Sequence, residues 1–247
     1  MSEKSFNATN AALPQIDIDT SETVNNTGYE ILAEQAALQE VGEASPCPEQ
    51  LIKPSDIESS KVYRSNIQIN TLCNSTAFLN CVKTARDNNP HGAFIGMNHT
   101  SEEYAEMTMM TINAGAAGVA VKSDGDIVSI FKNSIIARRD NIGQVIRLLL
   151  SEALHVGGKK LNCFDGYLSK IYIEAGFAPV CRLEFNDDSA PEGWNFDRDG
   201  RPDVVFMAHN NESPPPTTDM LQDLPYIRDY VEADKLVQTY LESKGQG

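Results

Sequence analysis

The segment "YLSKIYIEAGFAPV" (residues 167–180) decides how the second half of the chain is interpreted. Its pattern predicts a helix that ends at Gly176 and is followed by a strand. Tyr172 lies one helical turn before the Gly176-Phe177 pair. This spacing is either incidental to an ordinary α/β domain or a first indication of an enzyme.

Further elements are predicted on both sides of this segment. Two apolar stretches within residues 117–133 are joined by Ser-Asp-Gly-Asp, which indicates a β-hairpin. An apolar-striped helix over 141–158 ends at a Gly pair. From Gly118 the predicted order is strand, strand, helix, strand, helix, strand and strand. Upstream, we expect a strand over 61–70 and helices over 74–88 and 100–113.

Composition divides the chain into four predicted parts. These are an acidic, largely flexible arm (1–60), a domain (61–210), a Pro-rich linker (211–223) and a C-terminal helix (224–247). The formal net charge is −15, and residues 1–60 alone carry eleven acidic and two basic side chains. Such acidity argues against nucleic-acid binding, because the phosphates of a nucleic acid must be neutralised by Lys and Arg.

Cysteine use and hydropathy indicate the compartment. The five cysteines form no C-x-x-C pair, which favours reduced thiols over disulfides or a zinc site. No pair among the four histidines has metal-ligand spacing, so we expect no metal. No apolar segment approaches membrane-spanning length. We therefore expect a cytoplasmic protein without membrane contact.

Two motifs, together with the element order, resemble the GCN5-related N-acetyltransferase (GNAT) superfamily over roughly residues 62–210. The family commonly shows Asn-x-x-Ala-x-x-Leu-Tyr, then three residues and Gly-Phe. Residues 165–177 keep this spacing, with Asp165 in place of Asn and Leu168 in place of Ala. The family's pyrophosphate loop, Gln/Arg-x-x-Gly-x-Gly/Ala, is matched by "RRDNIG" (138–143), in which Asn141 takes the first Gly position. Asn tolerates left-handed backbone better than most residues.

The resemblance implies a GNAT-like α+β (α/β) fold with a mixed, mostly antiparallel central sheet. Helices flank this sheet, and its fourth and fifth strands splay. It also implies acetyl-CoA as co-substrate, an amine of a small molecule or protein as acceptor, and Tyr172 as general acid to the CoA thiolate. The residues expected to bind acetyl-CoA are Phe131, Asn133, Arg138, Arg139, Asn141, Ile142, Gly143, Gln144 and Asp165. Trp194, Arg198 and Arg201, in a long polar loop (186–201), are expected to contact the acceptor.

Other interpretations stay open at this point. Tyr172 can simply pack in the core, Asp165 can be a helix N-cap, and Trp194 can anchor the loop. The whole domain can be an inactive GNAT-like module that acts as a structural protein. Its partner would then be bound through the acidic arm or the C-terminal helix. A third alternative is a nucleic-acid-modifying enzyme with a local basic face, formed by Arg138, Arg139, Arg147, Lys159 and Lys160.

Overall fold

The structure is a computed structural model, and the described residues belong to one compact unit, Val41–Gly247. They are residues 57–64, 67–72, 74–96, 99–133, 142–210 and 215–244. Of the predicted arm, only the last four residues fall within this set. The predicted boundaries of the four parts therefore remain predictions.

The first sheet has five antiparallel strands in chain order. They are β1 (Ile57–Arg64), β2 (Ile67–Leu72), β3 (Thr108–Ile112), β4 (Ala117–Val121) and β5 (Ile127–Lys132). Two sequence predictions were wrong here. The single strand expected over 61–70 is a hairpin of two strands. The helix expected over 100–113 ends at Ala105, and its apolar second half is β3, because pairing with both β2 and β4 prevails over local helical spacing.

The second sheet has four strands. They are β6 (Lys160–Phe164), β7 (Phe177–Leu183), β8 (Val204–His209) and β9 (Tyr226–Ile227), in the spatial order β6-β8-β7-β9. All pairs are antiparallel except β7 with β9. The short strand β9 lies in the segment where the sequence predicted a helix from residue 224. The C-terminal helix itself begins at Tyr230.

The two sheets meet at one point. Among the described residues, the only backbone bridge between them is the parallel pair Asp126 and Lys160. Beyond it β5 and β6 share no ladder, since each pairs with its own sheet. The connection between these parallel strands is the helix α4 (Ile142–His155), which gives a β-α-β unit. The predicted fold class, an α+β sheet that is mostly antiparallel and splayed between these strands, is confirmed.

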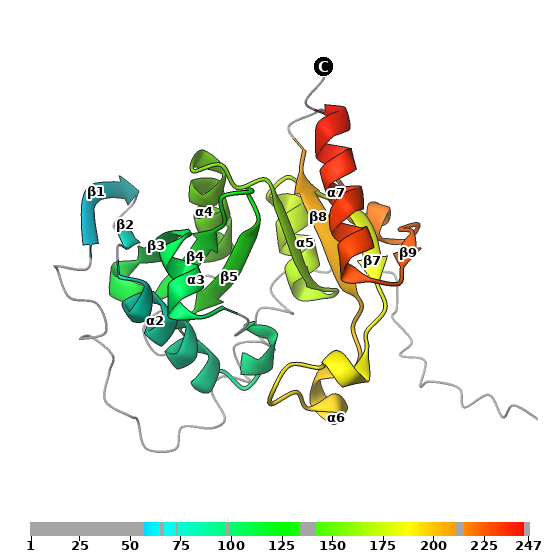
Figure 1. Ribbon diagram of the computed structural model, residues 1–247, viewed down its shortest axis with the longest axis horizontal. Helices are drawn as coiled ribbons and strands as arrows, with labels where there is room; N and C mark the ends of the chain where they lie inside the picture. Colours follow the sequence, from blue (N-terminus) through cyan, green and yellow to red (C-terminus); the bar gives the residue numbers. More distant parts are fainter. Residues whose placement is uncertain are drawn as a thin grey trace, which may run out of the picture. The chain divides into compact units, whose positions relative to one another are not determined.

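Helices cover both sheets (Figure 1). Their apolar side chains form three clusters with the strands. The helices α2 (Ser75–Asp87) and α3 (Ser101–Ala105) pack on one face of the first sheet. The helices α4 and α5 (Tyr167–Glu174) pack on the opposite side, in a core that both sheets share. The helix α7 (Tyr230–Lys244) packs on β7 and β8. The remaining short helices are η2 (Gly92–Phe94), η3 (Asn113–Gly115), η4 (Asp187–Ser189), α6 (Phe196–Asp199) and η5 (Thr218–Leu221).

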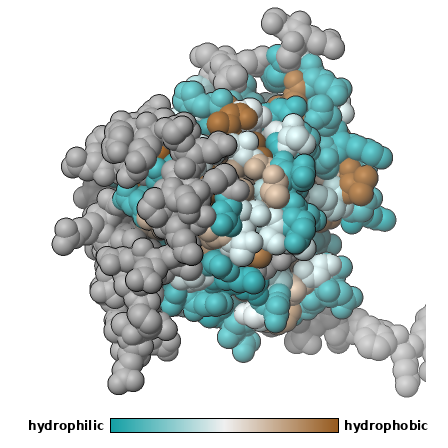
Figure 2. Space-filling view, turned by 60° about the vertical axis from the view of Figure 1, so that its left-hand side comes forward, coloured by the Kyte–Doolittle hydropathy of each residue, from teal (hydrophilic) through white to brown (hydrophobic). Residues whose placement is uncertain are grey.

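The visible surface is largely hydrophilic, with separate apolar patches (Figure 2). Tyr226, Tyr230 and Val231, at the junction of β9 and α7, are 63%, 51% and 62% exposed. Among the described residues, no helix is both long and apolar enough to cross a bilayer.

An ion-pair cluster reinforces the point where the sheets meet. Lys160 is only 6% exposed, and its Nζ lies 2.9 Å from an Asp124 oxygen in the β4–β5 turn. The same Nζ lies 2.8 Å from an oxygen of Asp234 in α7. One cation thus ties the first sheet, the second sheet and the C-terminal helix together.

Lys160→Met should lower the free energy of unfolding by about 1–2 kcal/mol, because two carboxylates lose their shared cation. Urea unfolding measures this loss. The matched control is Lys235→Met, since Lys235 is exposed on the same helix as Asp234. Equal stability of the two variants would contradict the role of the cluster.

The stability difference between wild type and Lys160→Met should also depend on pH. Burial lowers the pKa of Lys160, but hydrogen bonds with Asp234 and Asp124 outweigh it and raise the pKa overall. That contribution is present below about pH 10.4 and is lost as pH rises further. Burial raises the pKa of Asp124, yet the Lys160 hydrogen bond lowers it overall. This second contribution is lost as pH falls below about 4.

Candidate active site

A β-bulge interrupts β5 beyond the point where the two sheets meet. Gly118 pairs with Phe131 and Ala120 pairs with Val128, so the single residue between them on β4 faces two residues of β5. One of these two, Ser129, has φ of +53°, in the left-handed region that is rare for non-glycine residues. A bulge leaves backbone groups outside the ladder and often occurs beside active sites.

A buried tyrosine holds this bulge. The Tyr104 hydroxyl lies 2.6 Å from the Ser129 Oγ, and Tyr104 is fully buried. The rings of Phe78 and His99 pack on Tyr104 at centroid distances of 5.0 and 5.6 Å. Burial raises the pKa of Tyr104, which keeps its hydroxyl protonated. The strained backbone at Ser129 is therefore fixed by a neutral hydrogen bond from α3.

The helix that would face a cofactor pyrophosphate begins at the diverging ends of β5 and β6. Since α4 connects these two parallel strands, its N-terminus lies at the carboxyl end of β5. Ile142 and Gly143 open α4, and Gln144 is exposed in its first turn. Arg138, Arg139 and Asn141 lie outside the described residues. The first backbone N–H groups of such a helix lack partners within the helix and suit an anion.

The side chains of two predicted cofactor residues, Phe131 in β5 and Asn133 just after it, are buried in the core. Phe131 is 3% exposed, and its ring packs against Phe78 at 5.6 Å and over Gly118. Asn133 is fully buried, and its backbone N–H donates to Ala116 at 2.7 Å. The side chain of Phe131 and the N–H of Asn133 are therefore already in use.

Tyr172 lies in the core that α4, α5 and both sheets share. It is 4% exposed, and its hydroxyl makes no hydrogen bond among the described residues. Burial raises the pKa of Tyr172, and the nearby Cys163 raises it further. The phenol therefore stays protonated over the whole physiological range.

Asp165 is bound by other protein groups. Its Oδ1 accepts a hydrogen bond from Ser169 at 2.8 Å, and its Oδ2 lies 3.5 Å from Arg182. The same guanidinium pairs with Asp203 at 3.1 Å. Instead of capping α5 through its own side chain, Asp165 joins a network that ties β6 to β7 and β8. This engagement offsets the negative charge that replaces the family's neutral amide.

The loop between β7 and β8 (residues 184–203, the β7–β8 loop) is anchored by aromatic packing. The Trp194 ring lies 4.6 Å from Phe94, 4.8 Å from Phe164 and 5.2 Å from Phe185. These four residues form an aromatic cluster. Phe164 is the last residue of β6, so the cluster lies beside the strand end that diverges from β5. Trp194 also donates its Nε1–H to the Gly200 carbonyl at 3.0 Å.

The aromatic cluster lies on the same side of the sheets as the hydrogen bond between Tyr104 and Ser129, which we call the Tyr104–Ser129 clamp. Leu161 and Cys163 of β6 face the core of α4 and α5. Phe164 points to the opposite side, because successive strand residues alternate faces. Tyr104 belongs to α3, which also packs on that opposite side. The proposed cofactor helix and the β7–β8 loop thus approach the diverging strands from different sides.

Arg198 and Arg201 are paired within the β7–β8 loop. Arg198 makes two hydrogen bonds to Asp199, at 2.8 and 2.7 Å. Arg201 makes two to Asp187, both at 2.7 Å, and stacks over Phe196 at 4.7 Å. Both cations are neutralised by carboxylates of the same loop. Their predicted contact with an acceptor remains a prediction.

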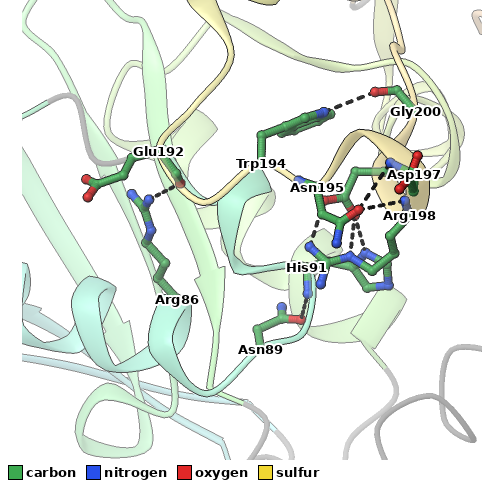
Figure 3. Close-up of polar contacts among 10 residues, drawn as sticks. Arg86, Asn89, His91, Glu192, Trp194, Asn195, Asp197, Arg198 and Gly200 are labelled. Carbon is green, nitrogen blue, oxygen red and sulfur yellow. Dashed lines mark hydrogen bonds and ion pairs between the residues drawn. The ribbon is translucent and has the colours of Figure 1, made fainter.

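The end of α2 and the segment that follows it contact this loop (Figure 3). Arg86 donates from Nη2 to the Glu192 carbonyl, and His91 Nδ1 lies 2.9 Å from Asp199 Oδ1. In the sequence, His91 was only one of four histidines without metal-ligand spacing, and it was given no role. Sequence analysis also missed Phe94, Phe164 and Phe185. No local spacing connects residues so distant in the chain, and only the isolated Trp194 marked the region.

No protein-family model and no curated protein matches this chain. Solved structures that are similar to it include three acetyltransferases. A probable GNAT-family acetyltransferase from Chromobacterium violaceum is 11% identical over 60% of this chain and 89% of its own, with a TM-score of 0.39. An IAA acetyltransferase from Bacillus cereus is 13% identical over 58% and 99%, with a TM-score of 0.38. A GCN5-related N-acetyltransferase from Rhodopseudomonas palustris is 10% identical over 60% and 98%, with a TM-score of 0.37.

Three features of the chain itself define its fold. These are the strand order, the β5-α4-β6 crossover and the divergence of β5 from β6. Together they give this chain a GNAT-like fold.

Phe94→Ala should loosen the β7–β8 loop, because it removes the ring that packs most closely on Trp194. Trp194 is the sole tryptophan, so its fluorescence should shift to longer wavelength and become easier to quench. Stability should fall by about 1–3 kcal/mol. Phe196→Ala, at a ring that is 37% exposed, is the matched control. Unchanged Trp194 emission in Phe94→Ala would refute the anchoring role of the cluster.

Proposed function

We propose that this chain is a cytoplasmic acyl-CoA-dependent N-acyltransferase. It would transfer an acetyl group from acetyl-CoA to an amine of a small molecule or a protein. The observation that carries the proposal is the divergence of β5 from β6 beyond a single bridge, with a bulge in β5. The cytoplasmic location is supported by three buried, reduced cysteines: Cys81, Cys163 and Cys181.

The cofactor arm would lie between the diverging strands and pair with the backbone of β5. The N-terminus of α4 would receive the pyrophosphate, with Arg138 and Arg139 supplying positive charge. The loop that carries these arginines precedes α4 directly in the chain. Fully buried Asn133 would shape the end of β5 rather than bind through its N–H, which Ala116 already occupies.

The chemistry would combine backbone polarisation with one proton donor. A backbone N–H of the bulge at Ser129 would donate to the thioester carbonyl oxygen and stabilise the developing oxyanion. The neutral amine would attack the carbonyl carbon directly, the C–S bond would break, and the amide nitrogen would release one proton to solvent. Tyr172 would then give its proton to the departing thiolate.

The second candidate is a non-catalytic GNAT-like interaction module. Two observations favour it: Asp165 is bound by Ser169 and Arg182, and Tyr226, Tyr230 and Val231 expose apolar surface where α7 begins. The first observation means that the Asp165 side chain, which the resemblance assigned to the cofactor, is already bound by other residues of the chain. The second gives the C-terminal segment a surface for a protein partner. The binding of acetyl-CoA separates the two candidates.

Acetyl-CoA should bind with micromolar affinity in a calorimetric titration. Arg138→Glu combined with Arg139→Glu should weaken this binding at least about 100-fold, because two anion-binding charges are reversed. The matched control is Arg228→Glu with Lys235→Glu, an equal charge change at exposed positions of the tail. Absence of binding by the wild type at millimolar acetyl-CoA would overturn the proposal and leave the interaction module.

Tyr172→Phe should lower kcat for acetyl transfer about 100-fold or more, with the acetyl-CoA Kd unchanged, because only the proton donor is lost. Release of free CoA thiol measures the rate. Tyr167→Phe is the control, since Tyr167 lies on the same helix and is 43% exposed. A Tyr172→Phe enzyme with wild-type kcat would exclude this hydroxyl as the acid.

A further inference from the structure

A histidine–aspartate pair joins the segment after α2 to the β7–β8 loop. His91 Nδ1 lies 2.9 Å from Asp199 Oδ1. The two side chains differ sharply in exposure, at 49% for His91 and 0% for Asp199. An accessible imidazole is thus held by a carboxylate that solvent does not reach.

Asp199 is fixed as an anion by several donors. Arg198 donates to both of its oxygens, and the backbone N–H of Asn195 donates to Oδ2 at 3.1 Å. The Arg198 hydrogen bonds, together with those from His91 and Asn195, hold the pKa of Asp199 well below its usual range, although burial opposes this shift. The carboxylate therefore only accepts hydrogen bonds at neutral pH.

This partner determines which imidazole nitrogen can take a proton. Because Asp199 only accepts, the neutral His91 ring must carry its hydrogen on Nδ1. Nε2 then keeps a lone pair, and among the described residues no group binds it. Orientation of an imidazole by a buried carboxylate, with the second nitrogen free, is the arrangement of general bases in hydrolases.

His91 also lies on the side of the sheets from which an acceptor would approach. Its ring is 6.0 Å from Phe94, and the Phe94 ring is 5.3 Å from Phe164 at the end of β6. The aromatic cluster thus connects His91 to the strand end that diverges from β5. The Tyr104–Ser129 clamp lies on the same side.

We infer that His91 is the general base that deprotonates the acceptor amine, and that Asp199 is its positioning residue. This inference rests on the proposed function. The protonated amine gives its proton to His91 Nε2, and its nitrogen then forms a bond to the thioester carbon. The C–S bond breaks, and the thiolate receives a proton from Tyr172. The amide nitrogen then releases its second proton to solvent, solvent returns a proton to Tyr172, and His91 gives up the proton that it took from the amine.

A purely structural role for the pair makes a different prediction. The β7–β8 loop is also held by Arg86 through the Glu192 carbonyl and by the packing of Trp194 on Phe94. Loss of the His91 ring should therefore leave the loop closed. Rate effects of His91 variants can then be separated from loop opening through Trp194 fluorescence.

The test is chemical rescue of His91→Ala. Acetyl-CoA is offered with ethanolamine, lysine and spermidine as probe amines, and free CoA thiol is measured. We expect kcat to fall about 100-fold or more, with the acetyl-CoA Kd and the Trp194 emission unchanged. Added imidazole should restore the rate, and more basic substituted imidazoles should restore it further. His155→Ala, at an exposed histidine, should keep the wild-type rate.

Asp199 is tested by a double-mutant cycle. Asp199→Asn should lower kcat in the wild type but should have no further effect in His91→Ala, because its role acts through the imidazole. An equal loss in both backgrounds would indicate a structural role and would overturn the positioning assignment.

The remaining outcomes separate this inference from the proposed function. If His91→Ala keeps the wild-type kcat, or if no imidazole restores the lost rate, His91 is not the base, and the proposed transferase activity is unaffected. If acetyl-CoA binds but no probe amine is acetylated, the assignment of His91 as base is also overturned, whereas the proposed binding of the cofactor is kept. No binding of acetyl-CoA overturns both.

Discussion

The structure depends on one narrow joint between two sheets. Asp126 and Lys160 form the single described backbone bridge, and the Lys160 ammonium then spans to carboxylates on both sides. A continuous ladder between β5 and β6 would close the space that a pantetheine arm needs. Complete separation would leave two small sheets, each with an unpaired strand edge. A joint at one end satisfies both constraints, because the strands meet where α4 ends and diverge where it begins.

This divergence gives two different environments to the two sides of the sheets. On one side α4 and α5 bury an apolar core that contains Tyr172. On the other side the Tyr104–Ser129 clamp and the aromatic cluster border the same strands. In the proposed reaction the donor would enter beside α4 and the acceptor beneath the β7–β8 loop, so the two substrates would approach from different sides.

Local signals in the sequence were sufficient for elements whose stability is mainly local. The Ser-Asp-Gly-Asp turn identified the β4–β5 hairpin, and the apolar stripe with its Gly pair identified α4. They failed at β3, where central sheet pairing outweighs helical spacing, and at β9, which exists only because β7 offers an edge. Arg198 and Arg201 were expected to contact an acceptor, and in the structure each pairs with a carboxylate of its own loop. The His91–Asp199 pair spans two distant segments, so no local pattern could reveal it.

The placement of the two proposed proton-transfer groups follows from their opposite tasks. Tyr172 is the proposed acid, and its proton stays on the phenol before the C–S bond breaks because burial raises its pKa. A base for a protonated amine must meet its substrate before the amine enters the apolar space, so it belongs at the surface. His91 lies there, half exposed, with its other nitrogen fixed by a buried anion. In the proposed reaction His91 would thus take a proton on the acceptor side of the sheets, and Tyr172 would give a proton on the core side.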